Sequence, residues 1–175
     1  MANYNERQKL VLEDVQIMFR NFSGKPSDYN REGDRNFTVI LPTEELAQRL
    51  AADGWNVKCR PGRDENEPPI YTLSVKVLFH DNPAEAYRDP KCYLVHEDGN
   101  LVQLTPETAG TIDNVRIRQC DMTIIPWCWN RNGRSGISSI LASLDPCSSI
   151  HNHSPSGVLQ KERRAEERRR GGVFV

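Results

Sequence analysis

Residues 115–144, VRIRQCDMTIIPWCWNRNGRSGISSILASL, carry the pattern that decides the fold. The first half is rich in isoleucine and tryptophan, and the last third alternates apolar and small residues. Between them, Asn130–Gly136 contains two glycines and two arginines, a composition typical of a chain reversal. The stretch therefore predicts two strands joined by a tight hairpin.

The alternation of apolar residues changes phase within the first of these strands. Val115 and Ile117 are in phase with each other, whereas Cys120, Met122 and Ile124 have the opposite parity. An extra residue near positions 118–120 would reconcile the two halves, so a β-bulge is expected there. Bulges bend strands in the way that barrel closure requires.

Alternating apolar residues predict further strands on either side of one short helix. In residues 10–19, Val11, Val15, Ile17 and Phe19 are expected to share the buried face. Thr43 is a natural helix N-cap before two glutamates, and Gly54 supplies a C-terminal stop. The predicted strands before and after this helix span residues 10–19, 36–41, 55–59, 71–79, 92–95 and 101–104.

These elements predict a mainly β fold, a small Greek-key (OB-like) barrel with one short helix and a basic, disordered C-terminal arm. A β-sandwich is the alternative. The expected division is an N-terminal arm at 1–8, the OB-like barrel domain at 9–147, and a linker with a charged C-terminal tail at 148–175. A homo-oligomer is left open.

The net charge of −1 conceals an asymmetry along the chain. Residues 161–170 carry six Lys/Arg and three Glu, or +3, so the remainder carries −4. An acidic body argues against binding duplex DNA by bulk electrostatics, so any nucleic-acid site must be a local basic stripe. The sequence has neither an apolar run long enough for a membrane span nor a signal peptide, so a cytoplasmic protein is expected.

The sequence does not predict an enzyme or a cofactor. It contains no GxSxG, Walker A or HExxH motif. The five cysteines form no CxxC pair and are expected to be reduced. Cys147, His151 and His153 lie close together in sequence but lack a fourth ligand, so no metal site is expected.

Two stretches combine aromatic rings, cations and glycines at turns. The first is Phe19–Phe37, FRNFSGKPSDYNREGDRNF, and the second is Trp127–Gly136, WCWNRNGRSG. Trp127 and Trp129 are two apart on a strand and project to the same side, so on the exterior they would form a platform for stacking bases. The alternatives are that the first stretch is a plain connection and that the indoles fill the end of the barrel.

Arg116 and Arg118 alternate with Val115 and Ile117, so they are expected to face solvent or a groove. Their alternative role is cross-strand pairing with acidic side chains.

The motifs FRNFSG…YNREGDRNF, DGWNVK, PPIYTLSVKV and PWCWNRNGRSGI resemble those of small bacteriophage-encoded single-stranded DNA-binding proteins with an OB-like fold. The resemblance covers residues 9–145. It implies a protein that coats single-stranded DNA during phage replication or recombination in the host cytoplasm. The tail KERRAEERRRGGVFV departs from the acidic tails common in such proteins, so replication or recombination partners would have to dock on basic and apolar chemistry.

Chemistry and resemblance together give one set of candidate nucleic-acid-binding residues. The alternative function is a phage module that binds a host protein through the same surface, because Trp, Tyr and Arg are also enriched at protein interfaces. The candidates are Arg20, Phe22, Lys25, Tyr29, Arg31, Arg35, Trp55, Lys58, Arg116, Arg118, Trp127, Trp129, Arg131 and Arg134.

Overall fold

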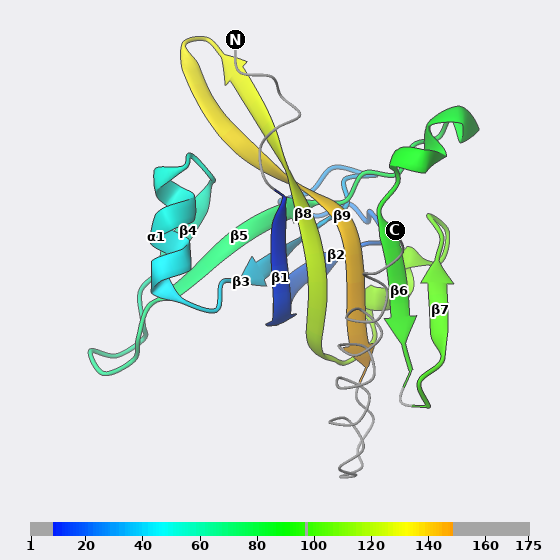
Figure 1. Cartoon of the computed structure of the whole chain (residues 1–175), viewed down its shortest axis with the longest axis horizontal. Coiled ribbons are helices and arrows are strands. Elements are labelled where there is room, and N and C mark those ends of the chain that lie inside the picture. Colours follow the sequence, from blue (N-terminus) through cyan, green and yellow to red (C-terminus); the bar gives the residue numbers. More distant parts are fainter. Residues whose placement is uncertain (1–8, 97, 149–175) are drawn as a thin grey trace, which may run out of the picture.

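The computed structural model describes residues 9–96 and 98–148, and these form one mainly β unit (Figure 1). No helix in these ranges is long and apolar enough to cross a membrane. The predicted N-terminal arm, the tail from residue 149 onward, and His151 and His153 lie outside the described residues. The elements are β1 Leu10–Val15, β2 Ile17–Asn21, β3 Asn36–Ile40, α1 Glu44–Ala52, β4 Val57–Arg60, β5 Ile70–Lys76, the 3₁₀ helix η1 Pro83–Arg88, β6 Lys91–Val95, β7 Leu101–Leu104, the 3₁₀ helix η2 Ala109–Asp113, β8 Ile117–Arg131 and β9 Arg134–Ser148.

All strands of the described part belong to one nine-stranded sheet, so the sandwich alternative does not apply. The main path runs β1-β8-β9-β5-β3-β2, with β4 added to β5 and the β6–β7 hairpin added to β9 (Figure 1). Strands β5 and β6 pair with β9 in parallel, and the other pairs are antiparallel. The predicted mainly β class with one short helix is confirmed.

The predicted strand at 10–19 is two strands, and its predicted buried face is only half right: Val15 is buried and Ile17 packs against the core, but the other two positions do not. β1 pairs with β8, whereas β2 pairs with β3. Asp14 and Phe19 have φ of 53° and 50°, so the alternation is interrupted twice. As a result Leu12 is buried, while Val11 and Phe19 are exposed.

The sheet does not close into a barrel by strand pairing, because β1 and β2 are the two ends of the path. These ends are consecutive in the chain and meet at Gln16, whose carbonyl accepts a hydrogen bond from the Ile40 amide at 2.9 Å. Arg20 of β2 bridges the opening toward β8. Its Nη1 donates to the carbonyls of Ile112 and Val115, both at 2.7 Å, immediately before β8 begins.

The helix α1 forms where the sequence predicts it. The Thr43 hydroxyl caps the helix by accepting a hydrogen bond from the Leu46 amide at 3.2 Å. Ala47 and Leu50 are buried against the sheet, and Gly54 ends the helix with a φ of 95° that favours glycine.

β8 and β9 form a long hairpin that extends past the rest of the sheet on the side where α1 lies (Figure 1). The register shifts between Ile117 and Gln119, so the predicted bulge is confirmed. Asn132 and Gly133 have φ of 53° and 75°, the left-handed values of a type I′ turn. β9 continues to Ser148, four residues beyond the predicted end.

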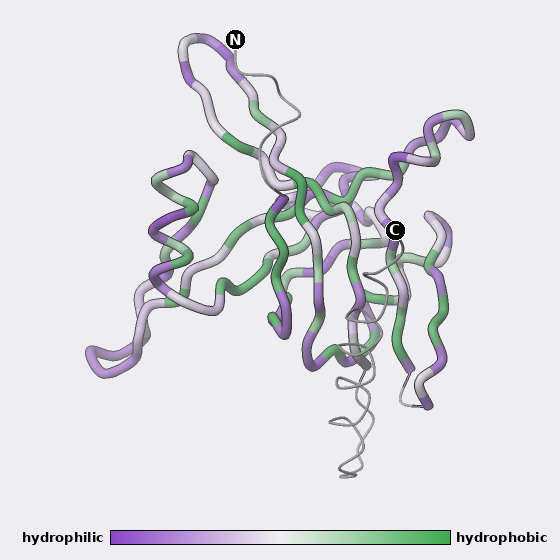
Figure 2. The backbone as a smooth tube through the Cα atoms, viewed as in Figure 1, coloured by the Kyte–Doolittle hydropathy of each residue, from purple (hydrophilic) through white to green (hydrophobic). Residues whose placement is uncertain are grey.

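The core lies between the curved halves of the sheet, where the strands alternate between hydrophobic and hydrophilic residues (Figure 2). At its centre the rings of Phe22 and Phe37 stack with centroids 5.2 Å apart, and both are 0% exposed. Phe22 was a candidate for binding nucleic acid, and its burial removes it from that role.

We expect Phe22→Ala to lower the free energy of unfolding by about 3–5 kcal/mol, because it leaves a cavity at the centre of the core. Tyr29→Ala, in the same loop region but 95% exposed, is the matched control and should change it by no more than about 0.5 kcal/mol. Urea denaturation measures both. Equal effects of the two substitutions would contradict the assignment of Phe22 to the core.

Candidate nucleic-acid interface

The outer face of the β8–β9 hairpin carries exposed rings. Alternation along β8 sends Cys120, Met122 and Ile124 into the core, and Trp127 and Trp129 outward. Trp127 is 51% exposed and Trp129 is 40% exposed. Ile125, on the same face, is also exposed. The indoles therefore lie outside the core, where they can form a platform.

Gly136 lets the Trp129 ring lie close against the hairpin. The two residues are register partners across β8 and β9. A Cβ atom at Gly136 would lie 2.8 Å from Trp129 Cζ2, closer than real Cβ contacts allow. The indole therefore lies across the backbone at Gly136, which supports one edge of the ring.

The loop between β2 and β3 is held by the side chain of Asn21. Its Nδ2 donates to the carbonyls of Lys25 and Asp34 at 3.0 and 2.9 Å, and its Oδ1 accepts from the Lys25 amide at 3.0 Å. The Gly33 amide also bonds the Gly24 carbonyl at 2.9 Å. These bonds hold the two arms of the loop together.

The entrance of this loop is tied to η2. The Asp113 carboxylate accepts hydrogen bonds from the amides of Phe22 and Ser23, at 2.8 and 2.9 Å. At the outer end of the loop, Tyr29 is 95% exposed and Arg31 is exposed beside it. The loop therefore presents an aromatic ring and a cation on an anchored segment.

Arg20 and Arg35 have structural contacts that sequence analysis did not predict. Arg20 binds the two carbonyls before β8, as described above. Arg35 Nη1 donates to the Pro106 carbonyl at 2.7 Å, and its guanidinium lies 5.0 Å from the centroid of the Phe79 ring. Both guanidinium groups are therefore engaged by the protein itself.

Trp55 also leaves the candidate set. It is only 8% exposed and packs in the core, where its backbone forms a bridge with Ile137 of β9. This contact places the start of β4 beside the hairpin. Trp55 therefore supports the hairpin instead of contacting a ligand.

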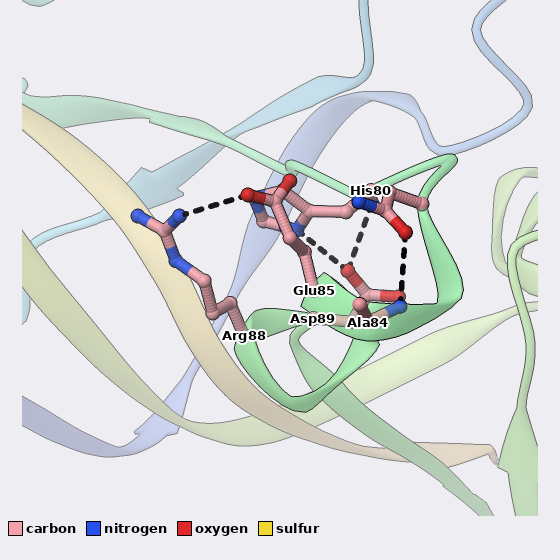
Figure 3. Close-up of polar contacts among 6 residues, drawn as sticks. His80, Ala84, Glu85, Arg88 and Asp89 are labelled. Atoms are coloured by element: carbon pink, nitrogen blue, oxygen red, sulfur yellow. Dashed lines mark hydrogen bonds and ion pairs between the residues drawn. The ribbon is translucent and has the colours of Figure 1, made fainter.

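The remaining candidate cations are exposed. Among the described residues, the contacts between basic and acidic side chains are His80–Asp89 at 2.8 Å and Arg88–Glu85 at 3.8 Å, and both belong to the segment around η1 (Figure 3). Neither involves a candidate, so the cross-strand ion pairs considered for Arg116 and Arg118 do not occur in this part of the chain. The exposed candidate cations are Lys25, Arg31, Lys58, Arg116, Arg118, Arg131 and Arg134.

One row of register partners connects the hairpin with the β2–β3 loop. Ile125 pairs with Ile140, Ile140 with Lys76, and Lys76 with Asn36. Register partners share a face of the sheet, and three strand spacings span about 14 Å. Asn36 Nδ2 then donates to Asn30 Oδ1 at 2.6 Å, one residue from Tyr29.

Sequence analysis missed Lys76 and Ile125 as members of this surface. Lys76 lies within the predicted strand at 71–79, but nothing in the sequence around it shows that β9 lies alongside. The alternation of residues along β5 and β8 shows which side chains face outward. It does not show that β5 lies beside β9, because these strands are far apart in the sequence.

The buried thiols of the sheet are not nucleophiles. Burial raises the pKa of Cys92 to about 12 and that of Cys120 to about 12, so both stay protonated at neutral pH. Cys120 Sγ donates a hydrogen bond to the Val15 carbonyl at 3.4 Å. These cysteines act as small apolar side chains of the core.

We expect Gly136→Ala to displace the Trp129 indole, because the added methyl group would overlap the ring edge. The tryptophan emission maximum should shift relative to the unsubstituted chain. Gly133→Ala is the matched control in the same hairpin: it strains the turn, but its Cβ meets no atom within 4 Å. Unchanged emission from Gly136→Ala would contradict the contact.

Comparison with known proteins gives a family and two similar structures. A family model described as "Putative phage ssDNA-binding domain" matches residues 1–145. The structure is similar to a C-terminally truncated single-stranded DNA-binding protein from bacteriophage Enc34, with a TM-score of 0.50, 11% identity, and coverage of 83% of this chain and 88% of that chain. It is also similar to the same phage protein in complex with ssDNA, with a TM-score of 0.51, 10% identity, and coverage of 83% and 89%. At these identities the likeness concerns the fold, and it agrees with the OB-like class. No curated protein sequence matches the chain.

Proposed function

The chain belongs to the family of phage ssDNA-binding domains, and we propose that it binds single-stranded DNA with little sequence preference by stacking bases on exposed rings and neutralising phosphates with Arg and Lys. The observation that carries this mechanism is the outward placement of Trp127 and Trp129 on the β8–β9 hairpin. Every base has a π-face, so an exposed indole binds bases of any sequence. The solved complex of the Enc34 protein with ssDNA supports the proposal by likeness of fold.

The DNA strand is proposed to cross the sheet instead of following one β-strand. It would run from the indoles of Trp127 and Trp129, over Lys76, to Tyr29 on the anchored loop. This direction follows the row of register partners from β8 to β3. A nucleic acid on this path meets rings at both ends and a lysine between them.

The cations of this surface suit phosphate because they are not paired within the described part of the chain. Arg131 and Arg134 face each other at the hairpin end, and Lys25 and Arg31 lie in the loop. An ion pair would have to be broken before phosphate could bind, and an exposed guanidinium avoids that cost. The overall charge of −1 then leaves duplex DNA without a general attraction.

The biological setting that we propose is phage DNA replication or recombination in the host cytoplasm. A protein that covers exposed bases protects transient single strands, and it needs affinity without catalysis. The role is therefore one of binding.

Trp127→Ala and Trp129→Ala should each weaken binding to oligo-dT by about 1–3 kcal/mol, because each removes one stacking ring. Fluorescence anisotropy of a labelled oligonucleotide measures the affinity. A chain with Trp127→Phe and Trp129→Phe keeps only Trp55 of the three tryptophans, and its emission should no longer be quenched by DNA. Unchanged affinity in both alanine variants would refute the platform.

Affinity should fall as salt rises, with a slope of about −0.7 in log–log units for each phosphate contact to a single strand. The double variant Arg131→Gln, Arg134→Gln should lower the magnitude of this slope by about 1.4. Arg88→Gln is the control, since Arg88 lies on η1 beside Glu85. If wild-type protein fails to bind oligo-dT even at low salt, the surface is a protein-binding site instead.

A further inference from the structure

We propose that Phe19, with Arg116 and Arg118, forms a second contact for the same single-stranded DNA, separate from the hairpin. The inference rests on the proposed function, since that function supplies the ligand. Phe19 is 71% exposed, although its ring is large and apolar.

The backbone at Phe19 is held in an unfavourable conformation. Its φ is 50°, in the left-handed region that bulky residues seldom occupy. Glycine or asparagine would adopt this conformation at lower cost. Residues held in this way persist only when their surroundings determine them, and they cluster at binding sites.

The neighbours of Phe19 supply that constraint. Arg20 is fixed by its two hydrogen bonds to the carbonyls of Ile112 and Val115. Asn21 is fixed by its bonds to both arms of the β2–β3 loop. The register between β2 and β3 shifts between Met18 and Asn21, so the backbone bulges at Phe19 and its side chain is exposed. The ring is therefore presented on a rigid segment, as a stacking site requires.

Two exposed arginines follow the carbonyl that Arg20 contacts. Arg20 contacts the carbonyl of Val115, and Arg116 is the next residue along the chain. Arg116 and Arg118 are both exposed and take no part in an ion pair among the described residues. An exposed ring and exposed guanidinium groups on two segments that Arg20 joins match the bases and the charge of a single-stranded nucleic acid.

The Phe19 patch, defined as Phe19, Arg116 and Arg118, is distant from the hairpin. Arg118 and Trp127 are nine residues apart on β8, or about 30 Å at 3.3 Å per residue. Asp121 and Asp145 face each other across β8 and β9 between them, and their carboxylates disfavour phosphate there. A short oligonucleotide would therefore occupy only one of the two surfaces, and a long one would reach both.

The test compares oligo-dT of about 5 and about 16 nucleotides, the range of site sizes known for OB folds. Phe19→Asn should lower affinity for the long oligonucleotide by about 5- to 100-fold and leave the short one bound as in wild type. Since asparagine tolerates a positive φ, this variant should be at least as stable as wild type in thermal unfolding. Phe19→Trp keeps a ring and should restore the affinity.

Two controls separate this inference from the proposed function. Tyr87→Ala removes an equally exposed ring on η1 and should leave binding of both oligonucleotides unchanged. Trp127→Ala should weaken binding of both lengths. If Phe19→Asn binds the long oligonucleotide as wild type does while Trp127→Ala does not, the second contact is refuted and the hairpin stands. If wild-type protein binds neither length, the proposed function itself fails.

Discussion

The contact on which the fold depends is the one that Arg20 makes with the two carbonyls before β8. The hydrogen-bonded path of the sheet ends at β1 and β2, so nothing in the strand pairing holds β2 to the start of β8. The guanidinium spans this opening and satisfies the carbonyls of Ile112 and Val115 at once. Only arginine offers a planar group with several donors at this reach, and a lysine would act as a single point charge.

The same contact organises the surface around it. Because Arg20 holds β2 in place, Asn21 can gather the two arms of the β2–β3 loop, and Asp113 can accept from the amides of Phe22 and Ser23. A hydrogen bond from a charged side chain to the backbone can contribute more to stability than one from a neutral side chain. If the two carbonyls lost their donor, the cost of their desolvation would lower the stability further. Hydrogen bonds thus fix the conformation of the β2–β3 loop, while burial of apolar side chains in the core stabilises the fold.

The parts of the fold with a strict period could be predicted from sequence, and the parts with irregular backbone could not. The β8–β9 hairpin and its bulge follow from the change of parity at Cys120, because only one face of each strand can be buried. Residues 10–19 have an equally clear alternation in the sequence. The positive φ values at Asp14 and Phe19 change which face of the sheet the following side chains occupy, so the alternation does not predict their burial. No local rule predicts such values for a phenylalanine, since they are imposed by contacts distant in sequence.

The candidate site residues likewise could be placed from sequence where they lie on regular strands, and could not where they lie in loops. Composition placed Phe22 and Tyr29 in one aromatic loop, yet one ring is in the core and the other is almost fully exposed. Likewise, composition could not separate Arg20 and Arg35, which bind backbone carbonyls, from Arg31, which faces solvent. Which side of the sheet a loop residue faces depends on the residues that it contacts, and these are far away in the sequence. Trp127 and Trp129 could be paired correctly because they lie on a strand, where spacing alone fixes a common face.

The distribution of charge shows how an acidic chain can belong to a family of ssDNA-binding domains. Long-range attraction depends on the total charge, which is close to zero here, whereas contact with phosphate depends on groups within a few ångströms. Arg131 and Arg134 meet at the end of a hairpin that projects from the body, and the acidic register pair of that hairpin, Asp121 and Asp145, lies ten or more residues back along the strands. Screening by salt removes most of the repulsion over that distance and leaves the local contacts less affected. Duplex DNA buries its bases and gains nothing from exposed indoles, so in the proposed binding mode stacking favours the single strand, while the charge of the body disfavours the duplex.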